Sequence, residues 1–90
     1  MNEAKQWTVT VDIDEHDGRT RATARLHTRD ARPLTAVGTA RLNPADRDVP
    51  EIGDELATAR ALSRLAHTLL DVAADDIEGL TATPPTRLHL

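Results

Sequence analysis

The stretch that decides the fold is Trp7–His27, WTVTVDIDEHDGRTRATARLH. Apolar and polar residues alternate strictly through its first half, which is typical of a half-buried β-strand. Asp17-Gly18 follows, and this pair of residues tolerates the positive φ angles of a two-residue hairpin turn. The stretch therefore predicts two antiparallel strands joined at Asp17-Gly18.

The turn also fixes which residues of the two strands face each other. The predicted apolar pairs are Ile13 with Ala22, Val11 with Ala24 and Val9 with Leu26, and the predicted polar pairs are Asp14 with Arg21, Thr10 with Arg25 and Thr8 with His27. Each pair matches in character, as cross-strand neighbours do. A slip of one residue would mix apolar and polar side chains on both faces, so the pattern supports this register.

A third strand and one long helix are expected after the hairpin. The strand is expected from about Thr35 to Leu42, and its facing is left open by the sequence: if Arg41 faces outward, then Ala36, Gly38, Ala40 and Leu42 face inward. The helix is expected to begin near Pro50, because Asp48 suits the N-cap and Glu51 stands three residues later. The order of elements predicts an α+β fold in which a three-stranded meander packs against the helix.

Apolar residues at helical spacing predict which side of this helix packs on the sheet. They are Ile52, Leu56, Ala59, Leu62, Leu65, Ala66, Leu69 and Ala73, and the residues expected to face water are Arg60, Arg64 and Asp71. The helix is expected to end near Asp75 or Asp76, with Asp76–Leu80 adding a short helical turn. Leu88 and Leu90 in the tail are expected to add a short strand, exchanged between the subunits of a dimer.

The chain of 90 residues is expected to form a single domain, residues 1–90, with extended tails at 1–5 and 81–90. It has no Phe, Tyr or Cys, and Trp7 is its only aromatic residue. A domain of this size has a thin stability margin even with large side chains in its core. Small scaffolds without disulfides or metals are commonly stabilised by association, so a homodimer is expected.

The composition argues against catalytic, cofactor and metal sites. No cysteine is present, Ser63 is the only serine, and the four histidines are scattered rather than gathered at the spacing of zinc ligands. We therefore expect a protein that is not an enzyme and takes no evident small-molecule substrate. The polar N-terminus and the lack of an apolar run of about 18 residues favour a cytoplasmic protein without a membrane span.

The charges are unevenly distributed, although the formal net charge is −4. Residues 1–42 carry seven basic and six acidic side chains, whereas residues 43–80 carry three basic and nine acidic ones. The candidate contact residues for RNA or the ribosome lie on the strands: Arg19, Arg21, Arg25, His27 and Arg41. Arginines can hold phosphates, but Asp12 and Asp14 share this face and no aromatic residue there can stack on bases. A solvated or dimer-forming face is the alternative.

Two segments carry a resemblance to a known family. They are Trp7–Arg21 and, above all, Ala40–Leu62, which contains ARLNPADR and VPEIGDEL. They resemble a family of short actinobacterial proteins of unknown function, several of which are associated with dormancy or hypoxic stress. The resemblance implies a fold similar to double-stranded-RNA-binding domains and ribosome hibernation factors, and an intertwined homodimer.

The resemblance implies a role on the ribosome or ribosomal RNA during stasis, and it supplies no catalytic residues. One alternative is a protein-interaction module whose acidic segment, Asp46–Glu78, docks a basic partner. Another is a small-molecule site or an enzyme formed only across a dimer interface. The sequence leaves these alternatives open.

Overall fold

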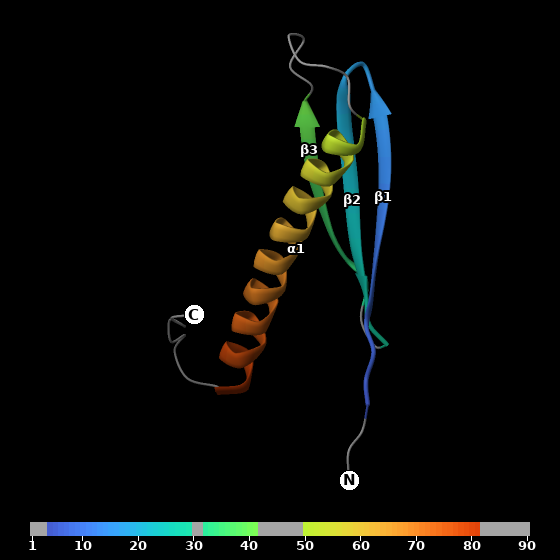
Figure 1. Cartoon of the computed structure of the whole chain (residues 1–90). Helices are drawn as coiled ribbons and strands as arrows, with labels where there is room; N and C mark the ends of the chain where they lie inside the picture. The colour runs from blue at the N-terminus through green and yellow to red at the C-terminus, as the bar shows by residue number, and fades with distance from the viewer. Residues whose placement is uncertain (1–3, 30–31, 42–49, 82–90) are drawn as a thin grey trace.

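The computed structural model describes residues 4–29, 32–41 and 50–81. Its elements are β1 (Thr8–His16), β2 (Arg19–His27), β3 (Leu34–Arg41) and α1 (Pro50–Thr81). The strands form one antiparallel sheet in the order β1-β2-β3, and α1 crosses one face of it (Figure 1). This arrangement confirms the predicted α+β class and the β-β-β-α order.

The hairpin has the predicted register. All six predicted pairs between β1 and β2 are present, from Ile13 with Ala22 to Thr8 with His27. Asp17 and Gly18 have φ angles of 51° and 71°. Positive φ at both positions is what a type I′ turn requires, and this turn matches the twist of the flanking strands.

The structure decides the facing of β3, which the sequence left open, in favour of an outward Arg41. Ala36, Gly38 and Ala40 are buried beneath α1, and Arg41 is exposed on the opposite face. At Gly38 the main chain of the helix lies directly against the sheet. A Cβ atom added there would lie 2.2 Å from the carbonyl oxygen of Ala57, far inside van der Waals contact.

The core is made mainly of small side chains. Its buried residues are Ala22, Ala24, Leu26, Ala36, Ala40, Ala57, Ala61 and Leu65, and Val11, Leu34 and Leu69 pack against them at its margin. Because α1 sits so close to β3, only alanines fit at the centre of the contact. A close contact of this kind leaves no room for large side chains between the layers.

The prediction of which helix residues face the sheet is wrong for several of the largest side chains. Leu65 is buried and Leu69 partly buried, as expected, but Ile52, Leu56 and Leu62 are 54%, 45% and 42% exposed. The residues that do face the sheet at its centre are alanines at other positions. The prediction assumed that the large apolar residues are the buried ones. The short distance between helix and sheet instead leaves room only for small side chains on the buried side.

The apolar side of β1 was predicted to be half-buried, and it is largely exposed. Val9 is 43% and Ile13 is 46% exposed, and only Val11 is partly covered. Three strands about 4.8 Å apart form a sheet wider than one helix of about 10 Å diameter. Because α1 packs on β3 and β2, the helix-facing side of β1 remains open.

The helix continues beyond its predicted end near Asp75 or Asp76 and reaches Thr81 without a break at Gly79. Its 32 residues span about 48 Å, whereas a nine-residue strand spans about 30 Å. The last turns therefore project past the sheet (Figure 1). None of the helical residues that the structure describes forms a segment long and apolar enough to cross a membrane.

Two arginines that were expected to face water are exposed, and they also reach the outer edge of β3. Arg60 donates a hydrogen bond of 2.8 Å to the carbonyl oxygen of Thr39, and Arg64 donates one of 2.9 Å to that of Val37. An edge strand with free main-chain groups can recruit a further strand. These two side chains occupy that edge.

Candidate nucleic-acid interface on the strands

The five residues predicted to contact RNA lie on the side of the sheet that faces away from α1. Arg19, Arg21, Arg25 and His27 occupy alternate positions of β2, so they share one face. Arg41 lies on the same face at the end of β3, directly opposite Arg19. The structure thus places all five on one surface but divides them into two groups.

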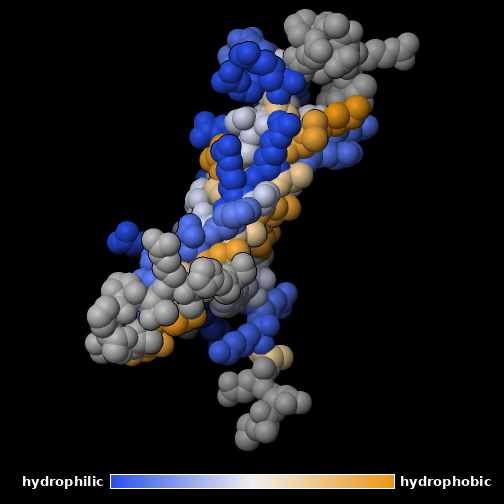
Figure 2. Space-filling view, turned by 90° about the vertical axis from the view of Figure 1, so that its left-hand side faces the viewer, coloured by the Kyte–Doolittle hydropathy of each residue, from blue (hydrophilic) through white to orange (hydrophobic). Residues whose placement is uncertain are grey.

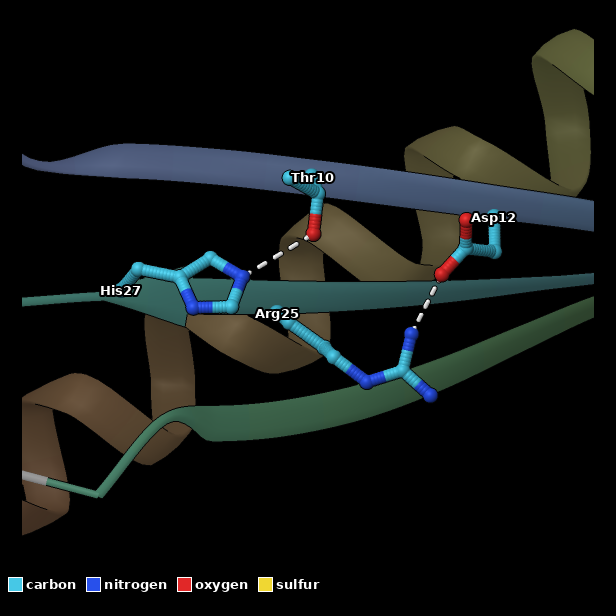
Figure 3. A network of polar contacts seen from close by, with 4 residues as sticks. All are labelled: Thr10, Asp12, Arg25 and His27. Carbon is cyan, nitrogen blue, oxygen red and sulfur yellow. Dashed lines mark hydrogen bonds and ion pairs between the residues drawn. The ribbon is translucent and has the colours of Figure 1, made fainter.

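The first group, Arg25 and His27, is paired with side chains of β1 (Figure 3). His27 lies 3.2 Å from the hydroxyl of Thr10, and Arg25 forms an ion pair with Asp12. In both cases the β2 side chain leans diagonally, past the residue directly opposite it, to the next one on the same face. The charge of Arg25 is therefore balanced within the sheet.

The second group consists of Arg19, Arg21 and Arg41, which line a hollow of about 440 Å³ at the turn end of the sheet. The remaining lining residues are Asp14, His16 and Asp17. All three arginines are exposed, and none of their guanidinium groups has an ion pair or hydrogen bond in the described part of the chain. Their donors are thus available to a ligand.

The alignment of Arg19 with Arg41 is electrostatically unfavourable by itself. The two residues are cross-strand partners, and like charges directly opposite each other destabilise a sheet. Asp14 is opposite Arg21 but forms no ion pair with it in the structure, and Asp17 is 3.2 Å from His16. An anion in the hollow would offset this repulsion between the two arginines. One guanidinium group can donate two parallel hydrogen bonds to the oxygens of a phosphate.

Of the two residues predicted to cap the helix, the structure describes only Glu51. Glu51 is exposed in the first turn of α1, where negative charge complements the helix dipole. The predicted N-cap residue Asp48 lies outside the described residues, as do Leu42 and the tail residues Leu88 and Leu90. Among the residues that are described, no group of three or more metal-binding side chains occurs.

His16 and Asp17 also belong to this site, although neither was predicted as a contact residue. Asp17 was assigned only to the turn, yet the hairpin register already placed His16 opposite Arg19. The adjacency of Arg19 and Arg41 could not be derived in the same way, since the connection between β2 and β3 contains no short turn that fixes their register.

Residues 5–86 match the sequence pattern that defines the Rv2632c-like family. The chain belongs to the Rv2632c-like family. It is 56% identical over 85 residues to the uncharacterized protein Mb1767 of Mycobacterium bovis, covering 94% of this chain and 89% of that protein. It is also 54% identical over 81 residues to the uncharacterized protein Rv2632c of Mycobacterium tuberculosis, covering 90% of this chain and 86% of that protein.

The fold of this Rv2632c-like chain also matches an experimental structure. The crystal structure of Rv2632c superimposes with a TM-score of 0.82 at 51% sequence identity, over 92% of this chain and 98% of that one. The actinobacterial family expected from the sequence is therefore confirmed through its mycobacterial relatives. The β-β-β-α arrangement is shared with a solved member of the family.

Proposed function

We propose that this Rv2632c-like protein is a non-enzymatic cytoplasmic protein that binds the phosphate backbone of structured RNA, with the ribosome as its target during dormancy or stress. The observation that carries this proposal is the hollow lined by Arg19, Arg21 and Arg41. Phosphate contacts supply most of the sequence-independent affinity for nucleic acids, and arginine is well suited to them.

The geometry favours binding of the backbone rather than of bases. The lining residues of the hollow include no Phe, Tyr or Trp, and His16 carries the one ring among them, so three phosphate-binding guanidinium groups outnumber the ring surface on which a base can stack. Arg19 and Arg41 come from adjacent strands and Arg21 follows on the same face, so the three guanidinium groups are arranged around one opening. Such a surface suits a duplex, whose phosphates are accessible while its bases are not.

The acidic net charge is compatible with this binding because the acidic residues are concentrated elsewhere. Residues 43–80 carry nine of the 15 acidic side chains. Of these, the exposed Glu51 and Glu55 lie on α1, which covers the opposite side of the sheet. Repulsion from the helix would orient the protein with its strands toward RNA.

Sedimentation with ribosomes at low and moderate salt tests the proposal. The wild-type protein is expected in the ribosomal fraction at low salt and to be depleted from it at moderate salt. Absence of the wild-type protein from the ribosomal fraction at both salt concentrations would contradict the proposal. Nuclease treatment that leaves binding unchanged would instead support a purely protein partner.

A matched pair of variants locates the contact. The double variant Arg21→Glu/Arg41→Glu changes the hollow, and Arg29→Glu/Arg32→Glu makes the same change of net charge in the connection between β2 and β3, where both residues are exposed. Binding is expected to fall about tenfold or more for the first and far less for the second. Equal losses would show that only net charge matters.

A protein-interaction module is the second candidate, and the exposed apolar side chains of α1 favour it. This function predicts capture of a protein partner that survives nuclease treatment and the replacement of Arg21 and Arg41. The two candidates use different faces of the molecule, so the same variants discriminate between them.

A further inference from the structure

The face of the sheet that carries the hollow is polar at nearly every position. Among the described strand residues that face away from α1, Val37 is the only apolar one. The large exposed apolar side chains lie on α1, on the other side of β1 and at Trp7. Figure 2 shows hydrophobic surface as an orange band that runs obliquely along the molecule beside hydrophilic side chains. Since RNA is contacted through charged and hydrogen-bonding groups, the polar strand face is the surface suited to it.

The side chains of this face form cross-strand rows, and two of these rows lie at the turn end. They are His16, Arg19 and Arg41 in the row next to the turn, and Asp14, Arg21 and Thr39 in the row behind it. Rows are roughly 7 Å apart along the strands, and neighbouring strands are about 4.8 Å apart. The hollow thus places a carboxylate and a guanidinium group, those of Asp14 and Arg21, side by side at one opening.

Asp14 brings an unpaired carboxylate to the hollow. It is exposed, and it forms no ion pair or hydrogen bond in the described part of the chain. Asp12, two residues earlier on the same face, is paired with Arg25. Asp17, the other carboxylate that lines the hollow, is 3.2 Å from His16. The oxygens of Asp14 are therefore open to a ligand.

The direction in which the β2 side chains lean explains why Asp14 is left without a partner. Arg25 and His27 each reach the β1 residue one step nearer the turn than the residue directly opposite (Figure 3). By the same lean, the residue that would reach Asp14 is Thr23, which lies opposite Asp12. The side chain of Thr23 is shorter than that of arginine or histidine, and no hydrogen bond joins it to Asp14 among the described residues.

A carboxylate beside three guanidinium groups favours a ligand that is more than an anion. Carboxylate and phosphate oxygens only accept hydrogen bonds, so Asp14 repels a bare phosphate. A ribose 2′-hydroxyl can donate a hydrogen bond, and its carbon is bonded to the carbon that bears the 3′-phosphate. In an A-form duplex these hydroxyls are displayed across the wide, shallow minor groove. RNA therefore offers the donor and the phosphate together, whereas DNA lacks the donor.

We propose that the hollow distinguishes RNA from DNA, with Asp14 accepting a hydrogen bond from a ribose 2′-hydroxyl while Arg21 holds the adjacent phosphate. This inference rests on the RNA binding proposed above and adds the chemical group that the site selects. Asp14 and Arg21 are direct cross-strand partners, so they can meet two neighbouring groups of one nucleotide. The row next to the turn leaves Arg19 and Arg41 for a neighbouring phosphate.

Fluorescence anisotropy with three duplexes of one sequence tests this inference. They are RNA, RNA in which fluorine replaces each 2′-hydroxyl, and DNA. The fluorinated RNA keeps the A-form helix but cannot donate the hydrogen bond, so it separates the donor from the shape of the duplex. The wild type is expected to bind the RNA about tenfold more tightly than either of the other two at the same salt, which is the scale of a hydrogen bond to a charged group.

Two alanine variants locate the contact. Asp14→Ala is expected to bind the RNA and the fluorinated RNA equally, and to bind the fluorinated RNA more tightly than the wild type does, because a negative charge is gone. Asp12→Ala removes the same charge from the same face but lies outside the hollow. It is expected to strengthen binding of both duplexes and to keep the preference for RNA. Both residues are exposed and outside the core, so the fold is expected to be retained.

The outcomes separate this inference from the proposed function. A wild type that binds the RNA and the fluorinated RNA equally would overturn the inference and leave RNA binding standing. A wild type that binds no duplex at low salt would overturn both. An Asp14→Ala variant that keeps the preference, or an Asp12→Ala variant that loses it, would show that Asp14 does not read the hydroxyl.

Discussion

The absence of a side chain at Gly38 lets the main chain of Ala57 touch the sheet. A Cβ atom on Gly38 would lie 2.2 Å from the carbonyl oxygen of Ala57 and 2.3 Å from the amide nitrogen of Ala61. The close approach of helix and sheet therefore requires glycine at this position. It explains why alanines fill the core and why the larger residues of α1 lie outside it.

Replacing Gly38 with alanine should destabilise the fold strongly, because the atoms in the way are main chain and cannot rotate aside. The expected loss is about 3 kcal/mol in the free energy of unfolding, measured by urea denaturation. Gly79→Ala is the matched control, since an added Cβ there meets no atom of the described residues within 4 Å. It should stabilise the helix by about 0.5 kcal/mol. Equal effects would contradict the close approach.

Replacing Arg60 and Arg64 with methionine should uncover the edge of β3. Methionine keeps the unbranched stem but cannot donate to the carbonyl oxygens of Thr39 and Val37. Each substitution is expected to lower the free energy of unfolding by about 1 kcal/mol. The double variant should also aggregate faster on incubation, as measured by thioflavin T fluorescence. An Asp71→Asn variant, which removes a charge elsewhere on α1, should show neither effect.

Replacing Asp12 with alanine should free Arg25 for ligands. The ion pair joins these two residues on the strand face, so its loss removes one negative charge and releases one guanidinium group. Affinity for duplex RNA is expected to rise several-fold, and the salt dependence of binding should steepen by about one phosphate contact. Fluorescence anisotropy over a salt series measures both quantities. Unchanged affinity and slope would place the RNA contact away from Arg25.

The hairpin turn should tolerate changes at its two positions unequally. Valine at Gly18, where φ is 71°, is expected to cost about 1 to 2 kcal/mol, because a β-branched residue fits the left-handed region poorly. Asparagine at Asp17, where φ is 51°, should cost less than about 0.5 kcal/mol. Thermal denaturation of the two variants checks the order, and a Gly18→Val variant as stable as the wild type would contradict it.

The hairpin was predictable in detail because a two-residue turn and a period of two leave only one consistent register. The helix start was also predictable from its local signals. Which side of α1 faces the sheet was not, since Ala57 and Leu56 are both compatible with helical periodicity. Only the clearance at Gly38 decides between them, and that clearance depends on residues of β3 distant in sequence.

The candidate site was predictable as a face but not as two groups. Alternation along β2 placed Arg21 and Arg25 on one face. That Arg25 is paired and Arg21 is not depends on side-chain conformations, which alternation does not determine. Arg25 leans to Asp12, and Arg21 joins the hollow with Arg19. The open side of β1 was missed for a related reason: alternation identifies an apolar face but does not reveal whether anything covers it.

Fluorescence anisotropy of a labelled RNA duplex over a salt series tests most directly whether the hollow at the turn end of the sheet binds the phosphate backbone. The wild type is expected to bind at low salt with an affinity that falls as salt rises, and Arg21→Glu/Arg41→Glu is expected to bind about tenfold more weakly than Arg29→Glu/Arg32→Glu. No binding of the wild type at low salt, or equal affinities of the two variants, would contradict the proposed contact.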